Sequence, residues 1–161
     1  MKRKEVIDFY NLISTLKVTK INEEISNAIL VNTMRTLPYS DTLYKVQEQL
    51  RKQLFSEFTQ ERLSKFEEDR VDPATKQKEF IQEYKDILDA NEKFIKALNT
   101  YLAQEVNITL EKVSYKDFIR ECNKAEQELT SKNITLLSAM FQDYTPEILI
   151  VTDEDINELL N

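Results

Sequence analysis

The sequence predicts a mainly α-helical protein: a long antiparallel helical hairpin within a helical bundle, with a minor two-stranded β element left open. Three observations lead to this fold class. The 161 residues include no Gly and only three Pro, so few positions favour a helix break. Residues 74–104 carry apolar side chains at three- and four-residue steps, as one face of a helix requires. Residues 106–110 alternate apolar and polar side chains, a pattern typical of a strand.

The segment 74–104 is the element around which the rest is organised. Neither Gly nor Pro interrupts it, so it is predicted to form one helix about 45 Å long. A helix of this length offers a spine on which shorter helices can bury their apolar faces. Its predicted inward residues are Phe80, Tyr84, Ile87, Leu88, Phe94, Ile95, Leu98, Tyr101 and Leu102.

Three helices are predicted before the spine, at residues 3–17, 21–37 and 40–69. Pro38 is expected to end the second, because proline disfavours the helical conformation of the residue before it. A short break at 70–73 then lets the third helix and the spine form the antiparallel hairpin. The predicted inward residues are Val6, Ile7, Phe9, Tyr10, Ile13 and Leu16, then Ile21, Ile25, Ala28, Ile29, Met34 and Leu37, then Leu43, Val46, Leu50, Leu54, Phe58 and Phe66.

Beyond residue 104 the predicted order is strand, helix, helix, strand and helix. Ser114 followed by Asp117 resembles a capping box, which predicts a helix start. A second helix restarts around Asn133, and Thr152 with Asp155 repeats the capping pattern near the end of the chain.

A chain of this length predicts a single domain over residues 1–161. We divide that domain into a helical bundle at 1–104 and a C-terminal part at 105–161.

Composition excludes several chemistries. Without Gly there is no glycine-rich phosphate loop, and helix ends must rely on Asn or on a following Pro. Without His the commonest general base and zinc ligand are absent. Cys122 is the single cysteine, so no intramolecular disulfide is expected. The sequence contains no run of about twenty apolar residues, so no membrane-spanning helix is predicted. We therefore expect a cytoplasmic protein with no cofactor and no membrane partner.

The net charge of −7 is unevenly distributed along the chain. Residues 1–20 carry +3, whereas residues 121–161 carry −7. An acidic chain without a basic face is poorly suited to phosphate backbones, so no nucleic-acid partner is expected. The basic start at Lys2, Arg3 and Lys4 is interpreted as a solvated terminus.

Carboxylates are the strongest candidates for a catalytic or metal site, and an Mg²⁺-dependent hydrolase is therefore a remote alternative. Lysines are interspersed among these acids, which favours a solvated face with ion pairs. We expect neither a catalytic nor a metal site, and hence no enzyme. The acids concerned are Glu68, Asp69, Asp72, Glu79, Glu83 and Asp86.

Cys122 has no His to activate it, and Glu121 beside it raises rather than lowers a thiol pKa. We expect it to be a small buried apolar residue. The tyrosines Tyr10, Tyr84 and Tyr101 fall on apolar stripes, so each is expected to pack its ring in the core and keep its hydroxyl wet.

The predicted partner-binding residues lie near the C-terminus. An apolar run is followed there by an acidic cluster. The run could pair with 106–110 inside the fold, or it could offer a strand edge to another protein while the acids steer a basic partner. These residues are Ile148, Leu149, Ile150, Val151, Asp153, Glu154 and Asp155.

The order of these elements resembles that of the small acidic helical proteins of unknown function from tailed bacteriophages. A helical start and long hairpin are followed by EVNITLEKV, then by a helix and SKNITLLSAMFQDY. The C-terminal EILIVTDEDINELLN departs from that pattern. The resemblance implies a phage-encoded virion component or assembly factor. Its partners would be proteins, including other virion proteins, with homo-oligomerisation open. The alternative is an acidic helical inhibitor or regulator of a host protein, acting against defence.

Overall fold

The computed structural model describes residues 1–17, 21–71 and 77–144. Within these ranges lie seven α-helices, and the β-structure there is limited to two isolated bridges. The predicted mainly α fold is therefore confirmed. The chain divides into two compact units, one made of Met1–Asn11 with Thr33–Thr109 and the other of Leu12–Asn32 with Leu110–Asn161.

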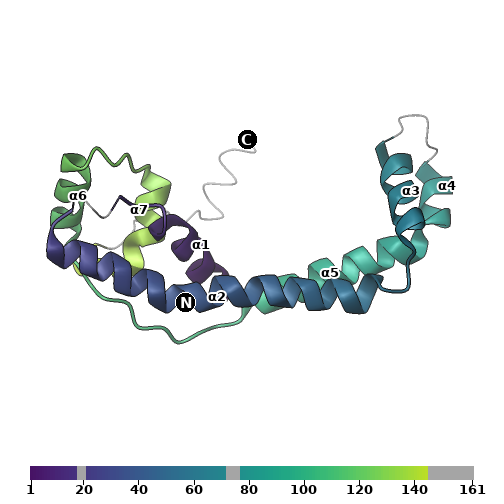
Figure 1. The fold of residues 1–161 in the computed structure, drawn as a ribbon, viewed down its shortest axis with the longest axis horizontal. Coiled ribbons are helices and arrows are strands. Elements are labelled where there is room, and N and C mark those ends of the chain that lie inside the picture. The colour runs from purple at the N-terminus through teal and green to yellow at the C-terminus, as the bar shows by residue number, and fades with distance from the viewer. Residues whose placement is uncertain (18–20, 72–76, 145–161) are drawn as a thin grey trace, which may run out of the picture. The chain divides into compact units, whose positions relative to one another are not determined.

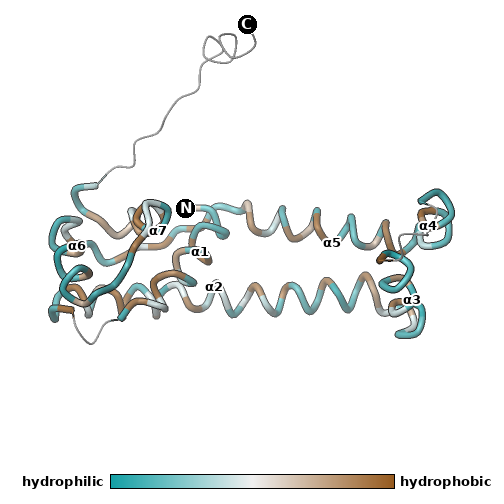
Figure 2. The backbone as a smooth tube through the Cα atoms, turned by 90° about the horizontal axis from the view of Figure 1, so that it is seen from above, coloured by the Kyte–Doolittle hydropathy of each residue, from teal (hydrophilic) through white to brown (hydrophobic). Residues whose placement is uncertain are grey.

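The first unit contains the hairpin (Figures 1 and 2). Its elements are most of α1 (Arg3–Ile13), α2 (Glu23–Phe55) from Thr33 onward, α3 (Gln60–Val71), α4 (Gln77–Glu83) and α5 (Lys85–Ala103). The later part of α2 and α5 run side by side in opposite directions, and α3 and α4 connect their far ends. The predicted antiparallel hairpin is thus present, but its two long arms begin and end at other residues than expected.

Pro38 does not end a helix, contrary to the prediction. It lies inside α2, which continues for 33 residues. Proline removes one backbone hydrogen bond and crowds the carbonyl four residues earlier. Met34, which carries that carbonyl, and Pro38 are both exposed, so water can reach the carbonyl. Thr42 Oγ1 donates to the carbonyl of Pro38 at 2.6 Å, which supports the next turn.

The predicted third helix, 40–69, was also wrong in its bounds. Its first part belongs to α2, the chain turns after Phe55, and α3 starts at Gln60. Thr59 explains the restart, because its Oγ1 accepts a hydrogen bond from the backbone N–H of Arg62 at 3.2 Å. A threonine in this position satisfies a donor that the first helical turn leaves unpaired.

The predicted spine is divided into α4 and α5 at Tyr84, whose backbone has φ −110° and ψ 23°. The irregularity is local, since Tyr84 N still donates to Phe80 O at 3.0 Å and Leu88 N to Tyr84 O at 2.9 Å. The Tyr84 side chain is buried and bonds to Asp69 on α3. The contact of Tyr84 with α3 accounts for the break between α4 and α5. The apolar periodicity of the sequence does not reveal this break.

The start of the chain pairs with the segment after α5. Arg3 N donates to Gln104 O at 2.9 Å and Val106 N to Met1 O at 2.9 Å, around an antiparallel bridge between Lys2 and Glu105. In residues 105–113 the described backbone forms bridges at its two ends but no regular strand. The alternation expected at 106–110 is visible as burial, because Leu110 is buried and its polar neighbours are exposed. Its proposed pairing partner, 148–151, lies outside the described residues.

The second unit packs α6 (Tyr115–Lys124), α7 (Ser131–Leu137) and the 3₁₀ turn η2 (Ser138–Met140) with the start of α2. Ser114 caps α6 as predicted, since its Oγ accepts from Asp117 N at 3.4 Å. Thr130 and Asn133 form a capping box at the start of α7. The core of this unit consists of Ile13, Leu16, Ile25, Ala28, Ile29, Leu110, Val113, Phe118, Cys122, Ala125, Leu137, Met140 and Phe141.

Two polar pairings hold the extended segment of the second unit. The buried side chain of Asn32 accepts from Glu111 N at 2.7 Å and donates to Glu111 O at 3.0 Å. The Asn32 amide therefore makes the two hydrogen bonds to the Glu111 backbone that a neighbouring strand would make in a sheet. Val113 then forms a parallel bridge with Phe141. Both pairings satisfy backbone groups that would be costly to bury unpaired.

The end of α6 shows how a chain without Gly ends a helix. Glu126 has φ 53°, in the left-handed region, and Gln127 N donates to Cys122 O at 2.9 Å. This bond, from a residue five positions further along, is the Schellman arrangement, in which Gly usually occupies the left-handed position. Our expectation of Asn or Pro at helix ends is therefore wrong here, because a glutamate adopts this conformation.

Candidate functional site

The first unit holds two candidate sites: the polar and aromatic cluster where α3, α4 and α5 meet, and one side of the hairpin that α2 and α5 form. The cluster contains the carboxylates predicted as the strongest chemical candidates. Phe66, Tyr84 and Ile87 form its buried centre. The rings of Phe66 and Phe80 stack at 5.4 Å, and Tyr84 meets Phe66 edge-on at 5.4 Å. The polar side chains of the cluster therefore come from helices that pack tightly against one another through this apolar centre.

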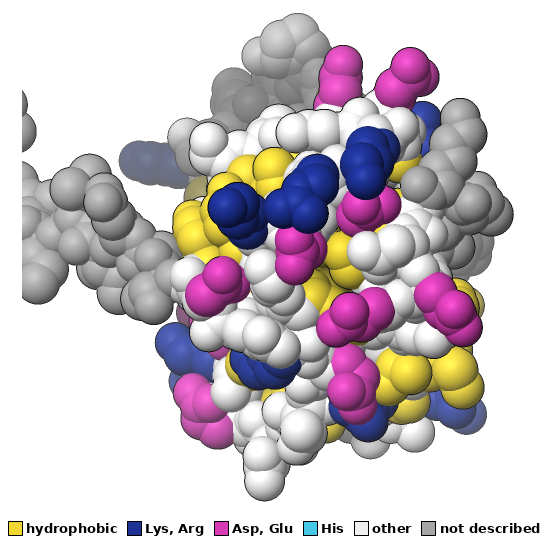
Figure 3. All heavy atoms as spheres, turned by 90° about the vertical axis from the view of Figure 1, so that its left-hand side faces the viewer, with side chains coloured by type: hydrophobic (Ala, Val, Ile, Leu, Met, Phe, Trp, Pro, Cys, Tyr) yellow, Lys and Arg dark blue, Asp and Glu magenta, His cyan; other side chains and the backbone are white. Residues whose placement is uncertain are grey.

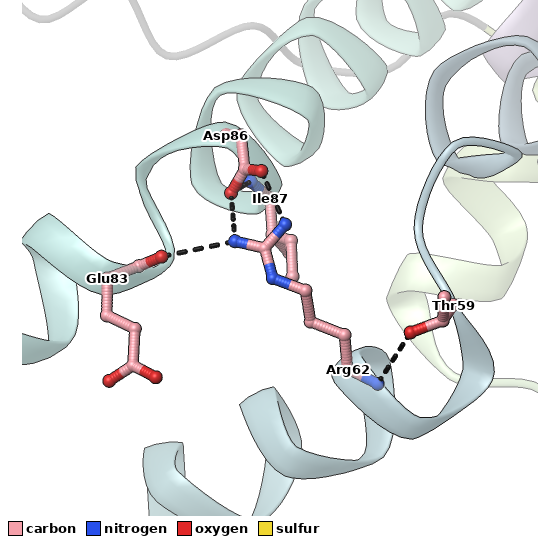
Figure 4. A network of polar contacts seen from close by, with 5 residues as sticks. All are labelled: Thr59, Arg62, Glu83, Asp86 and Ile87. Carbon is pink, nitrogen blue, oxygen red and sulfur yellow. Dashed lines mark hydrogen bonds and ion pairs between the residues drawn. The ribbon is translucent and has the colours of Figure 1, made fainter.

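Arg62 forms a fork with Asp86 (Figure 4). Its Nη1 lies 2.5 Å from Asp86 Oδ2 and its Nη2 2.7 Å from Oδ1, while Nη2 also donates to the carbonyl of Glu83 at 3.1 Å. Asp86 Oδ1 further accepts from Ile87 N at 2.9 Å, in the first turn of α5. Two parallel bonds between a guanidinium and a carboxylate give a defined geometry, so this fork fixes α3 against the start of α5.

The electrostatics of the fork favour both charged forms. The hydrogen bond from Arg62 lowers the pKa of Asp86, and the backbone bond from Ile87 acts in the same direction. The same carboxylate raises the pKa of Arg62. A carboxylate with a lowered pKa stays ionised at neutral pH and is a poor general acid or base there. The fork is therefore a structural ion pair.

Tyr84 and Asp69 make the second polar contact of the cluster. The Tyr84 hydroxyl donates to Asp69 Oδ2, and this bond, with burial as the second cause, raises the pKa of Tyr84 to about 12. The phenol therefore keeps its proton through the physiological range. The expectation of a core ring is confirmed at Tyr84, but the hydroxyl was expected to be wet and instead has the Asp69 carboxylate as its partner.

The remaining candidate carboxylates do not converge. Glu68, Glu79 and Glu83 are exposed, and Asp72 lies outside the described residues. Among residues 1–17, 21–71 and 77–144, no three side chains of the Asp, Glu, Cys or His type are placed to hold a metal ion. In the same ranges, no helix combines the length and apolar character needed to span a membrane.

Cys122 is buried in α6 of the second unit. Burial, and then the charge of Glu121, raise the pKa of its thiol to about 11. A thiol in this state is a weak nucleophile at neutral pH. The prediction of a small buried apolar residue with a raised thiol pKa is confirmed.

The basic start is partly used inside the first unit. The guanidinium of Arg3 lies 4.3 Å from the ring centre of Tyr101 and donates to its hydroxyl at 3.3 Å. It also donates to Gln104 Oε1 at 3.2 Å. Lys4 forms an ion pair with Asp8 at 2.5 Å. At Arg3 the contact is thus with α5 rather than with solvent alone.

The hairpin is open on one side. Tyr44 and Ile95 are 65% and 57% exposed, although Ile95 was predicted to face inward. Met34 and Leu37, also predicted inward, are 73% and 38% exposed. The prediction was wrong for these residues because a two-helix hairpin covers each helix on one flank only, so an apolar stripe wider than the contact is left uncovered.

Apolar side chains of both helices line neighbouring hollows on this side, among them Phe55 of α2 and Leu88 and Ile95 of α5. One hollow measures about 390 Å³ and lies among α2, α3 and α5, with Leu63 as its lining residue from α3. It shares Asn91 with a hollow along α5 and Arg51 and Phe55 with another along α2. We define the open face as Tyr44 and Phe55 of α2 with Leu88, Ile95 and Leu102 of α5.

The open face was not found from the sequence, although signals for it exist. Leu88, Ile95 and Leu102 recur every seven residues, a spacing typical of helix–helix seams. Tyr44 and Phe55 lie eleven residues apart, which is about three turns. The residues predicted to bind a partner, 148–151 and 153–155, lie outside the described residues.

Comparison with protein-family models finds no matching family, and comparisons with curated proteins and with solved structures find no significant match.

Proposed function

We propose that this chain is a non-enzymatic protein that acts by binding other proteins, as a virion component or assembly factor of a phage. The observation that carries the proposal is the open face, where Tyr44 of α2 and Ile95 of α5 are exposed beside the half-buried Phe55, Leu88 and Leu102. A continuous apolar surface with a polar rim is typical of a binding site. The phage setting comes from the sequence resemblance.

The polar groups support this proposal over catalysis. Asp86 and Asp69 are occupied by Arg62 and Tyr84, so two of the acids that an enzyme mechanism would need are committed to packing α3 against its neighbours. The Cys122 thiol is buried with a raised pKa. These groups stabilise the fold and leave the open face as the best-formed candidate for recognition.

The visible surface of the second unit adds a comparison. On the side seen in Figure 3, acidic and basic side chains are interspersed among apolar ones. An inhibitor that mimics nucleic acid needs clustered carboxylates, which the mixed charges of this side do not resemble. The acidic cluster at 153–155 remains a predicted contact for a basic partner.

The experiment compares capture by three baits from a lysate of phage-infected bacteria. The first is the wild type and the second carries Tyr44→Glu with Ile95→Glu. The third carries Gln53→Glu with Lys93→Gln as a control. Both double variants change the net charge by the same amount, with one exposed site on each long helix. Gln53 is about 180° around α2 from Tyr44, and Lys93 about 160° around α5 from Ile95, at 100° per residue.

The proposal expects a protein that the wild type and the control capture and the open-face variant does not. Equal capture by all three baits would reject the open face as the binding site. A fourth bait that lacks residues 146–161 tests the predicted contact at 148–155 separately. If that bait loses the captured protein while the open-face variant keeps it, recognition lies in the C-terminal segment.

A further inference from the structure

We propose that the open face binds the open face of a second copy of this chain, so that two hairpins form a four-helix bundle. The inference rests on the proposed protein-binding function and names one partner for it. Three features of the first unit support this: the incomplete seam between α2 and α5, the mixed charges of the two helices and of the rim, and the available area.

The seam between α2 and α5 is incomplete. No described side chain is fully buried between Thr36 and the end of α2, nor after Ala90 in α5. Leu43, Val46 and Leu50 of α2 are only half-buried. Helical proteins bury their apolar stripes by packing more than two helices around one core. A second hairpin supplies the missing two.

Charge favours a copy of the same surface. Residues 33–55 carry four basic and two acidic side chains, and residues 85–103 carry three of each. The hairpin thus has a charge of +2 in a chain of −7. A face of one sign would indicate a partner of the opposite sign. Under a two-fold axis each face meets itself, and a mixed, nearly neutral rim allows this without strong repulsion.

The rim of the open face shows this mixture. Glu48 and Arg51 form an ion pair at 3.1 Å, and both line the hollow along α2. Glu92 and Lys96 line the corresponding hollow along α5. Each copy therefore presents acids and bases on both helices. A facing copy in the opposite direction can bring groups of unlike sign together.

The area is sufficient for a dimer. The 19 residues of α5 give a face about 28 Å long, and two helices side by side are roughly 20 Å wide, or about 560 Å² when flat. Side chains that interdigitate increase the accessible area above the flat value. This is the same order as the roughly 800 Å² per partner of a standard specific interface.

The test uses the full chain in sedimentation equilibrium over a range of concentrations. The wild type is expected at twice the chain mass, with a melting temperature that rises with concentration, because association stabilises the folded state by mass action. Tyr44→Glu with Ile95→Glu should weaken the dimer at least tenfold and keep the helical circular dichroism. The control, Gln53→Glu with Lys93→Gln, should remain dimeric.

Three results would overturn the inference: a wild type that stays monomeric at its solubility limit, an open-face variant that stays dimeric, or a control that dissociates equally. Ile95→Glu alone replaces the double variant if the latter fails to fold, and should shift the equilibrium in the same direction. A monomeric wild type whose open face still captures another protein would reject the second copy and keep the proposed function. If the open-face variant is monomeric while all baits capture the same proteins equally, the second copy is supported as the partner of the open face. The same result would reject the open face as the site that captures other proteins.

Discussion

Glu126→Gly should stabilise the second unit, although it removes a side chain. At φ 53° the Cβ of Glu126 crowds the following carbonyl, at a cost of roughly 1–2 kcal/mol. Glycine avoids this cost but loses more backbone entropy on folding, by roughly 0.5–1 kcal/mol. The difference leaves a net gain of about 0.5–1 kcal/mol. For a chain of this size that corresponds to a rise in melting temperature of roughly 1–4 °C.

Glu128→Gly is the matched control for this prediction. It removes the same charge and introduces the same residue, and both positions are exposed. Among the described residues only Glu126 has positive φ, so the control bears the entropic cost without relief of strain and should lower the melting temperature. Thermal and urea unfolding, followed by circular dichroism, compare the two variants. If Glu126→Gly destabilises the protein as much as Glu128→Gly does, the left-handed position is not strained and the reasoning fails.

Three further predictions concern the fork, the thiol and the two cores. Because Arg62 lowers the pKa of Asp86 in the folded state, the fork's stabilisation is present above the ordinary carboxyl pKa and is lost as pH falls through the lowered one. The melting-temperature gap between the wild type and Asp86→Asn should therefore narrow in acid, and a gap independent of pH would contradict this. Cys122 should react with a thiol reagent at neutral pH only after denaturant is added, and rapid native labelling would show that its burial is transient. Phe118→Ala should cost roughly 3–5 kcal/mol and the half-buried Leu98→Ala only about 1–2.5 kcal/mol; urea unfolding measures both, and equal costs would refute the difference in burial.

Local signals in the sequence predicted local structure well. Ser114 and Asp117 lie three residues apart, and the cap they form at α6 needs no information from elsewhere in the chain. The apolar periodicity similarly identified most residues that face another element, from Val6 to Ile87. These predictions succeed because helix geometry relates sequence spacing directly to position on a face.

Breaks that depend on distant residues were predicted poorly. Tyr84 interrupts the predicted spine because it is held by Asp69, fifteen residues earlier. The fork joins Arg62 and Asp86 across 24 residues. Pro38 carries a strong local signal for a helix end, yet α2 continues through it. In each case a tertiary contact, or access of water to a carbonyl, outweighs the local preference.

Depth of burial was the hardest property to predict at the candidate site. Periodicity identifies the side of a helix that is apolar, but the number of neighbouring helices decides how much of that side is covered. Ile95 belongs to the apolar stripe of α5 and is nevertheless 57% exposed, because α2 is the one described helix that lies alongside this part of α5. The open face is therefore a consequence of architecture rather than of any motif.

The incomplete burial of the hairpin's apolar residues and its suitability for binding have the same origin. Half-buried residues such as Leu50 and Leu98 give less than the full transfer free energy of a buried leucine. A partner that covers the open face would remove the remaining apolar area from water and recover that difference. Folding of the hairpin and binding are then thermodynamically linked, since whatever binds only the folded form must stabilise it. Substitutions on the open face should accordingly act mainly on the assembled state, whereas substitutions at the Arg62–Asp86 fork should act on the isolated chain as well.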